Sequence, residues 1–374
     1  MTTTSLVDCF SVIRDPRQES KIDHELIDIL VLCVFGVICG AEGWQDIEEV
    51  GHVRLSWLQE RGFLKNGIPV DDTIARIVSR LCPEELQRCF INWMSAVEGA
   101  TGGKVVAIDG KTLRHSYDKK KRKAAIHMVS AFAAENGVVL GQIKTMDKSN
   151  EITAIPALLD FLDVKGCIVT IDAMGCQEKI VEKIIAKEAD YVLAVKGNQK
   201  QLHEEIIDFF QTARTYDFQG VKYDYFEEAH KGHGRVEQRR YWISDMLGSI
   251  SNPGRWSSLC SIGMVESERY IDGKTTSEIR YFISSLTADA KIFSNAVRKH
   301  WAIENQLHWV LDVSFREDES RVRRDNAPEN MAVFRHVVMN ALRKEKTCKK
   351  GVKAKRFKAT LQAEYAQKVL NGIF

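Results

Sequence analysis

The order of apolar and amphipathic segments between residues 104 and 215 limits this chain to few folds. The runs KVVAID, GCIVTID and DYVLAVKGN are almost continuously apolar, which is typical of strands buried on both faces of a sheet. Segments with helical spacing separate them, and Asn136-Gly137 predicts a tight hairpin between two strands. The expected order is three strands, helix, strand, helix, strand, helix, which is an α/β layout with helices packed on a mixed sheet.

The regions on either side of this segment have different patterns. The N-terminal part has helical spacing, and its longest apolar run, Leu26 to Ala41, carries Asp28 and is too short to cross a bilayer comfortably. After the α/β segment, polar and apolar residues alternate as in half-exposed antiparallel strands, and amphipathic helices follow. We expect a helical N-terminal domain, the first part of a core, a β-rich insertion, the completion of the core and a basic tail, at residues 1–100, 101–215, 216–287, 288–345 and 346–374.

Composition excludes few functions. The 374 residues carry a formal net charge of only +2, so the chain as a whole does not require a polyanionic partner. Two basic clusters, Lys119 to Lys123 and Arg343 to Lys358, are each compatible with a solvated surface or with a phosphate-binding surface. The nine cysteines form no C-x-x-C pair, and their odd number favours free thiols in a reducing cytoplasm.

Two aspartates, Asp109 and Asp172, each follow a buried strand. One such aspartate is usually a turn residue, but two on separate strands of one sheet are expected to lie close together at its edge, where sites form in open α/β sheets. The motif Ile-Asp-Gly-Lys-Thr recurs at Asp272, where the flanks alternate in polarity. We therefore interpret Asp272-Gly273 as a hairpin turn rather than a site.

Neighbouring carboxylates repel each other, and oxygen ligands suit Mg²⁺ or Mn²⁺. A pair of such ions about 3.5–4 Å apart can polarise a phosphodiester and activate its attacker. The best third ligand is Glu304, on a predicted helix that also carries Trp301 and His308 at three- and four-residue spacing, with Asp312 as its rival. The alternative is an amphipathic helix whose acids face solvent, and Trp301 and Trp309 are expected to be core residues.

Several motifs together resemble the DDE-type transposases of bacterial insertion sequences, in particular the H-repeat-associated (Rhs-associated) branch. They are AIDGKTLR, TIDAMGCQ, LAVKGNQ, HGRVEQRRY and RKHWAIENQLHWVLDVSFREDESRVRRDNAPEN. The resemblance implies a ribonuclease-H-like core with Asp109 on its first strand, Asp172 on its fourth and Glu304 on a helix after the insertion. It also implies Mg²⁺- or Mn²⁺-dependent cleavage and strand transfer at the ends of a mobile element, with the three acids as catalytic metal ligands.

The implied partner is double-stranded DNA, bound by a cytoplasmic, nucleoid-associated dimer without a membrane anchor. The N-terminal helices are the candidate for recognising the element ends. Candidate DNA contacts are Lys111, Lys196, Asn198, His233, Arg235, Arg239, Arg298, His300, His308, Arg321 and Arg323. Relatives carry Tyr, Arg and Lys where this chain has Val297, His300 and Leu311. Other readings are a nuclease that joins nothing, a silent DNA-binding relic, and a hydrolase of small phosphate esters.

Overall fold

The computed structural model describes residues 5–97, 104–117, 124–145, 150–232, 235–271, 273–371 and 373. Its N-terminal part is helical, as predicted. The helices are α1 (Leu6–Ser11), α2 (Leu26–Ile38), α3 (Trp44–Gln59), α4 (Asp71–Val78) and α5 (Pro83–Val97). The apolar helix α2 is buried along almost its whole length. No helix in these described ranges is both long enough and apolar enough to pass through a bilayer.

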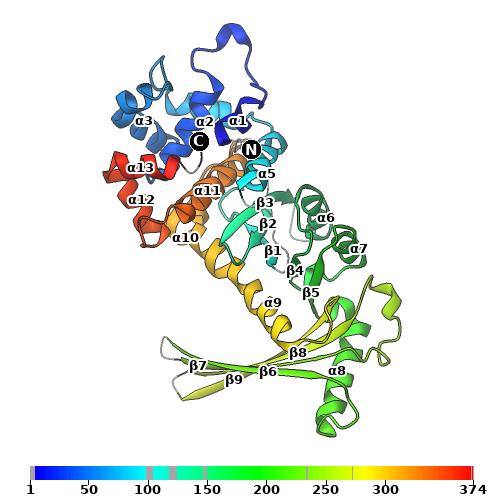
Figure 1. The fold of residues 1–374 in the computed structure, drawn as a ribbon. Coiled ribbons are helices and arrows are strands. Elements are labelled where there is room, and N and C mark those ends of the chain that lie inside the picture. Colours follow the sequence, from blue (N-terminus) through cyan, green and yellow to red (C-terminus); the bar gives the residue numbers. More distant parts are fainter. Residues whose placement is uncertain are drawn as a thin grey trace.

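The centre of the molecule is a mixed sheet that confirms the expected α/β order and the ribonuclease-H-like core (Figure 1). Strands β1, β2 and β3 form an antiparallel meander, and β4 and β5 add to β1 in parallel. Gly137, with a φ of +69°, forms the predicted turn between β2 and β3. The bounds are β1 (Val105–Thr112), β2 (His127–Ala133), β3 (Val138–Thr145), α6 (Glu151–Phe161), β4 (Ile168–Ile171), α7 (Glu178–Ala186), β5 (Asp190–Val195) and α8 (Lys200–Thr215).

The β-rich segment extends this sheet instead of forming a separate one. Its strands are β6 (Asp224–Gly232), β7 (Arg235–Ser244), β8 (Ser261–Ile271) and β9 (Lys274–Ser284). Strand β9 pairs antiparallel with β5, so the order of the sheet is β3-β2-β1-β4-β5-β9-β8-β7-β6. Strands β8 and β9 pair up to Ile271 and Lys274, and Gly273 has a φ of +80°. This confirms the hairpin predicted there, although Asp272 itself lies outside the described residues.

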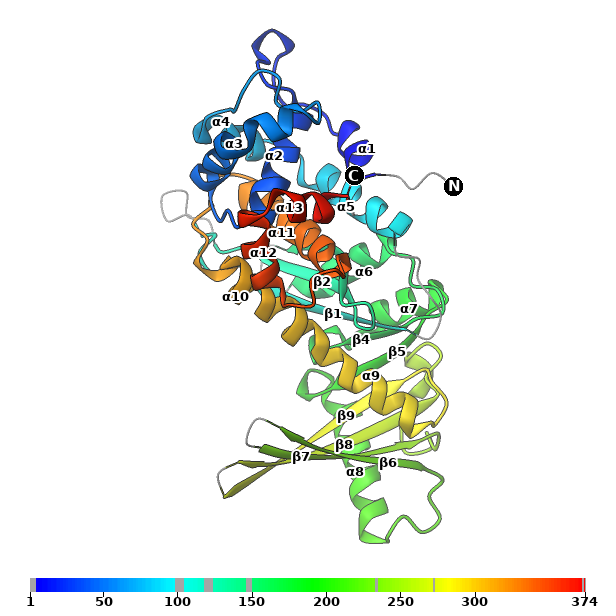
Figure 2. The same cartoon turned by 60° about the vertical axis from the view of Figure 1, so that its left-hand side comes forward.

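A long helical segment follows the insertion and crosses one face of the sheet (Figure 2). It consists of α9 (Ala290–Ala302), a π-helical turn (Ile303–His308) and α10 (Trp309–Phe315), and α11 (Ala327–Lys344) comes after it. Helix α9 contacts β1, β4 and β5 of the core and also β6 and β7 of the insertion. Helix α11 packs against α2 and α5 and against β3, so one hydrophobic core joins the N-terminal helices to the sheet.

The C-terminal segment differs from the expected basic tail, because it folds into α12 (Val352–Leu361) and α13 (Ala363–Leu370). Two cations at the centre of the basic cluster are buried here. Lys355 donates to the carbonyl oxygens of Leu342 and Glu345, at 2.6 and 2.5 Å. Arg356 donates to the carbonyl of Val37, in the last turn of α2, and to that of Ala41, just beyond the helix. The other basic cluster, at Lys119 to Lys123, lies outside the described residues.

Candidate active site

The register of two parallel strands brings Asp109 and Asp172 side by side. The pairing of β1 with β4 ends at Ile108 and Ile171, and each aspartate is the next residue in the chain. Both strands are fully buried up to that point. The hydroxyl of Thr170, two residues before Asp172, lies 3.1 Å from Nδ1 of His300 on α9. Side chains alternate along a strand, so this face of the sheet is the one that α9 covers.

The third acid, Glu304, comes from the π-helical turn that follows α9. A π turn closes i to i+5 hydrogen bonds and is uncommon outside functional sites. It places Glu304 with Asp109 and Asp172 on the wall of one cavity of about 220 Å³. The three acids are far apart in the sequence, and the structure brings them together.

His308 is the last residue of the same turn and lies next to two of these acids. Its Nδ1 is 3.6 Å from Oδ2 of Asp109 and 3.4 Å from Oε2 of Glu304, and its side chain is buried. The other ring nitrogen, Nε2, is buried without a hydrogen-bond partner among the described residues. His308 was predicted as a DNA contact, but its position suits support of the acids better than contact with a phosphate.

The acids share a strained electrostatic environment. Burial, a hydrogen bond with Glu304 and the negative charges of Glu304 and Asp172 raise the pKa of Asp109 to about 8. Hydrogen bonds from His308 and Asp109 lower the pKa of Glu304 to about 2. In the absence of an added cation, burial and the neighbouring acids therefore favour the protonated form of Asp109.

A divalent cation fits Asp109, Glu304 and His308, while Asp172 lines the same cavity but is not part of this group. One ligand atom from each of Asp109, Glu304 and His308 can be chosen so that all lie within 4.8 Å of one another. Carboxylate oxygens are the ligands that Mg²⁺ and Mn²⁺ prefer, and a cation would relieve the repulsion that protonates Asp109.

Comparison with known proteins identifies the family. A family model described as a transposase DDE domain matches residues 100–341, and a model of its associated domain matches residues 7–94. The chain belongs to the DDE transposase family. It is 49% identical to "Putative transposase YncI" of Escherichia coli O157:H7 over 99% of this chain and 95% of that protein. It is 44% identical to "H repeat-associated putative transposase YhhI" of Escherichia coli K12, over 100% of this chain and 99% of that protein.

A solved structure, the synaptic complex of piggyBac transposase with hairpin DNA, aligns with 98% of this chain and 77% of its own. The TM-score is 0.43 and the identity is 11%, which is too distant to bear on function.

Two glycines allow close packing behind the acids of this DDE transposase. A Cβ on Gly110 would collide with the buried pair formed by His127 and Glu151, whose Nε2 and Oε1 lie 2.5 Å apart. Gly175 is equally close to Ile171, in the turn after Asp172. Sequence patterns did not single out His127 and Glu151, because their pairing becomes visible only once β2 and α6 are placed.

Lys111 and Asp312, both considered at the sequence level as parts of the site, bind each other instead. Lys111 also lies 2.8 Å from Glu317 Oε2 and 3.8 Å from Asp318 Oδ1, and its side chain is only 12% exposed. Three carboxylates thus surround its ammonium group, and we leave Lys111 out of the proposed DNA contacts. Neither Lys111 nor Asp312 lines the cavity of the acids.

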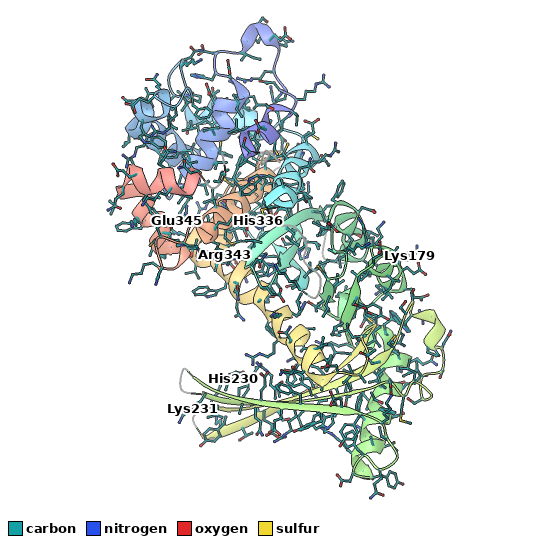
Figure 3. All side chains as sticks on the ribbon, viewed as in Figure 1. Lys179, His230, Lys231, His336, Arg343 and Glu345 are labelled. Carbon is teal, nitrogen blue, oxygen red and sulfur yellow. The ribbon has the colours of Figure 1, made fainter. Side chains whose placement is uncertain are left out.

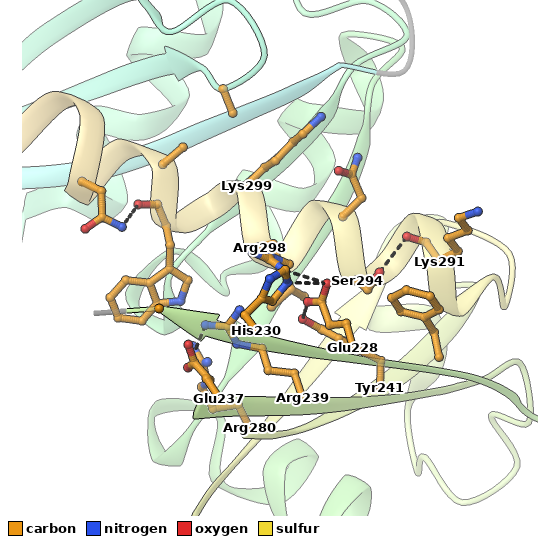
Figure 4. Close-up of a pocket in the computed structure, with 18 of the residues that line it drawn as sticks. Glu228, His230, Glu237, Arg239, Tyr241, Arg280, Lys291, Ser294, Arg298 and Lys299 are labelled. Atoms are coloured by element: carbon orange, nitrogen blue, oxygen red, sulfur yellow. Dashed lines mark hydrogen bonds and ion pairs between the residues drawn. The ribbon is translucent and has the colours of Figure 1, made fainter. Parts of the chain in front are cut away.

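A second, larger cavity of about 820 Å³ lies next to the acids, between α9 and the β6–β9 sheet. In Figure 4 side chains of the sheet and of α9 face each other across it. Figure 3 shows His230 and Lys231 on the part of the sheet that extends away from α8. We call this cavity the basic groove. Its charged and histidine side chains are Glu228, His230, Lys231, Glu237, Arg239, Arg280, Lys291, Arg298 and Lys299.

Some of the cations of the basic groove form ion pairs with carboxylates of the same groove. Arg298 lies 2.6 Å from Glu228 Oε2, and Arg239 lies 2.8 Å from Glu237 Oε1. Both were predicted as DNA contacts, and both line the groove. Of two further predicted contacts, His233 lies outside the described residues, and so does the side chain of Arg235, the first residue of β7.

The other predicted contacts lie around the acids or on the nearby surface. Lys196 and His300 line the acid cavity, and burial and then the charge of Arg280 lower the pKa of His300 to about 4. Asn198 donates to the carbonyl of Ala173 at 2.6 Å, which fixes the turn after Asp172. Of the remaining two, Arg321 is exposed, and Arg323 donates a hydrogen bond to the carbonyl of His115.

Two tryptophans were wrongly expected in the core. Trp301 is 44% exposed and Trp309 is 59% exposed. The helical pattern predicted a core position wrongly for Trp301, because Trp301 lies on the same helical face as Glu304. This face lines the two cavities rather than the core. Sequence analysis also missed Arg280, which lines both cavities.

Proposed function

We propose that this chain cleaves DNA at the ends of a mobile element and joins the freed ends to target DNA. The observation that carries the proposal is the convergence of Asp109, Asp172 and Glu304 on one cavity, where the pKa of Asp109 is raised to about 8. Three acids on the wall of one cavity, one of them with a raised pKa, favour a divalent cation.

Asp109, Asp172 and Glu304 would hold Mg²⁺ or Mn²⁺, with His308 beside them. When bound, the metal supplies Lewis-acid stabilisation of the charge that develops on the phosphate and lowers the pKa of a coordinated water. The protein orients the acids through the β1–β4 register and through the π turn. His308 would orient these side chains, since its Nδ1 lies within 3.6 Å of a carboxylate oxygen of Asp109 and within 3.4 Å of one of Glu304.

The proposed reaction has two balanced steps. Water adds to a phosphodiester at the element end, the bond from phosphorus to O3′ breaks, and the products are a 3′-hydroxyl and a 5′-phosphate. That 3′-hydroxyl then attacks a phosphodiester of the target, forming a new ester and releasing a target 3′-hydroxyl. The second step exchanges one ester for another, so it requires no external energy source.

The basic groove is the proposed path of the DNA, because it adjoins the acid cavity and carries lysines that have no ion pair within the described part of the chain, at positions 231 and 291. The helical region of residues 1–100 stays our candidate for recognising the element ends. It shares a core with α11, so point variants on its surface test this role better than a truncation does.

The test uses a plasmid that carries the coding sequence with its native flanking DNA, incubated with the full-length protein and Mn²⁺. We expect nicks at the element ends, and joined products with a target plasmid. The Asp109→Asn and Asp172→Asn variants should lose cleavage by at least about 10³-fold, while a Glu182→Gln change, at an exposed position of α7 that lines neither cavity, should not. Cleavage without joining would favour a nuclease, and equal cleavage by Asp109→Asn would refute the proposed site.

A further inference from the structure

We propose that Arg280 binds a phosphate of the DNA strand at the point where the basic groove opens into the acid cavity, and that it positions the scissile phosphodiester. This inference rests on the proposed function and adds a residue to it. Arg280 lies on β9, a strand of the insertion, so the insertion would take a direct part in positioning the substrate.

The location of Arg280 is the first observation. Three residues line both the acid cavity and the basic groove, namely Arg280, Val297 and Trp301. Arg280 is the only one of these three with a charge, so it marks the junction for an anionic ligand. Figure 4 shows its side chain on the sheet side of the groove, next to Glu237.

The shortage of anionic partners is the second observation. The side chain of Arg280 is 14% exposed, and its Nε makes no hydrogen bond to any described residue. The nearest carboxylate, Glu278, lies 3.7 Å from Nε, which is beyond hydrogen-bonding distance. The acid on the neighbouring strand, Glu237, already pairs with two other arginines, Arg239 and Arg269, at 2.8 Å each.

Among the described side chains, the ion pairs of this group therefore join three guanidinium groups to two carboxylates, Glu237 and Glu278. A buried cation without a hydrogen-bonded anion costs free energy, which a bound phosphate would recover. Consistently, burial and then the neighbouring Arg239 and Arg269 lower the pKa of Arg280. Guanidinium groups bind phosphates through two parallel hydrogen bonds, so Arg280 suits this ligand better than a lysine would.

The third observation is the contact between Arg280 and Trp301. The guanidinium carbon lies 5.6 Å from the centre of the indole ring, within the range of a cation–π interaction. Trp301 is one helical turn before Glu304, and this contact ties the orientation of Arg280 to the segment that carries the third acid. The arginine is thus preorganised relative to the acid cavity, as a positioning residue requires.

The test compares Arg280→Gln and Arg280→Lys with a matched control, Arg240→Gln. Arg240 lies on β7 of the same sheet but binds Glu266 and Glu268 and lines neither cavity. For binding, the probe is a forked duplex of arbitrary sequence, measured without metal over a range of salt concentrations. For cleavage, the substrate is the plasmid with the native flanking DNA described above.

We expect Arg280→Gln to reduce the slope of log K against log salt by about 0.9, which corresponds to one lost phosphate contact. Cleavage should fall by about 10²-fold, with partial recovery in Arg280→Lys. Mn²⁺ affinity should stay within about twofold of the wild type, and the melting temperature should not fall, because an underpaired buried cation is removed. Arg240→Gln should change neither the slope nor cleavage.

Two results would overturn the role of Arg280: an unchanged salt slope, or a loss of melting temperature and Mn²⁺ affinity together, which would indicate a structural role. If the wild type cleaves no DNA but the slope still falls in Arg280→Gln alone, the phosphate contact stands and the proposed catalytic function fails. The two proposals are therefore tested separately.

Discussion

Replacing Gly110 by alanine should destabilise the protein and disturb Asp109 at the same time. The added Cβ would lie within van der Waals overlap of His127 Nε2 and Glu151 Oε1, and 2.9 Å from Glu151 Cδ. Neither neighbour can swing away easily. His127 and Glu151 are 3% and 4% exposed, they bind each other at 2.5 Å, and Nδ1 of His127 is fixed by the hydroxyl of Thr112 at 2.8 Å.

The expected loss of stability follows from the groups that the new methyl group must displace. Overpacking of a filled site costs about 1–3 kcal/mol, and a buried polar group left without its hydrogen bond costs about 1–3 kcal/mol. We therefore expect the free energy of unfolding to fall by about 3 kcal/mol, and Mn²⁺ affinity to fall because Asp109 precedes the displaced backbone. Urea denaturation measures the first quantity and calorimetric Mn²⁺ titration the second.

The control is Gly232→Ala, at the end of β6, where a Cβ would meet nothing within 4 Å. It should change stability by no more than about 0.5 kcal/mol. Adding Glu151→Ala to Gly110→Ala makes room for the methyl group, so the double variant should be less destabilised than the sum of the single variants. A Gly110→Ala protein as stable as the control would refute this packing argument.

Three further predictions concern the charged groups. Since the pKa of Asp109 is raised to about 8 and a metal binds its ionised form, Mn²⁺ affinity should rise about tenfold per pH unit below pH 8 and level off above it, as measured by titration at several pH values. Glu304→Gln should weaken Mn²⁺ binding at least about tenfold, whereas Asp312→Asn should leave it within about twofold, and the reverse order would make Asp312 the ligand. Lys111→Met should cost about 3 kcal/mol in urea denaturation, since buried Glu317 loses a partner at 2.8 Å, yet it should not alter the salt slope of DNA binding.

The sequence was informative where one pattern had one structural solution. Continuous apolar runs require strands buried on both faces, and this requirement, with the hairpin signal at Asn136-Gly137, predicted the core sheet and the neighbouring ends that carry Asp109 and Asp172. The two copies of Ile-Asp-Gly-Lys-Thr were separated by their flanks alone, and the pairing of β8 with β9 agrees with that distinction.

Features that depend on contacts between distant segments were not predictable in this way. A helical pattern of uniform period cannot reveal the π turn, which changes the direction of residues beyond it and leaves Asp312 facing Lys111. Arg280 belongs to no motif, and its importance follows only from the meeting of β9 with α9. The burial of the C-terminal cations was not predictable, because the carbonyl groups that they contact, at the ends of α2 and α11, are remote in sequence.

The pairing of β5 with β9 makes the insertion a continuation of the core sheet. The distance that its outer part extends from the core is therefore set by the length of its strands, at about 3.4 Å per residue. Lengthening β8 and β9 by two residues each should carry the tip about 7 Å farther while keeping every side chain on its own face. Lengthening them by one residue should turn the outer residues to the opposite face, so natural variation in the length of this arm is expected to come in steps of two.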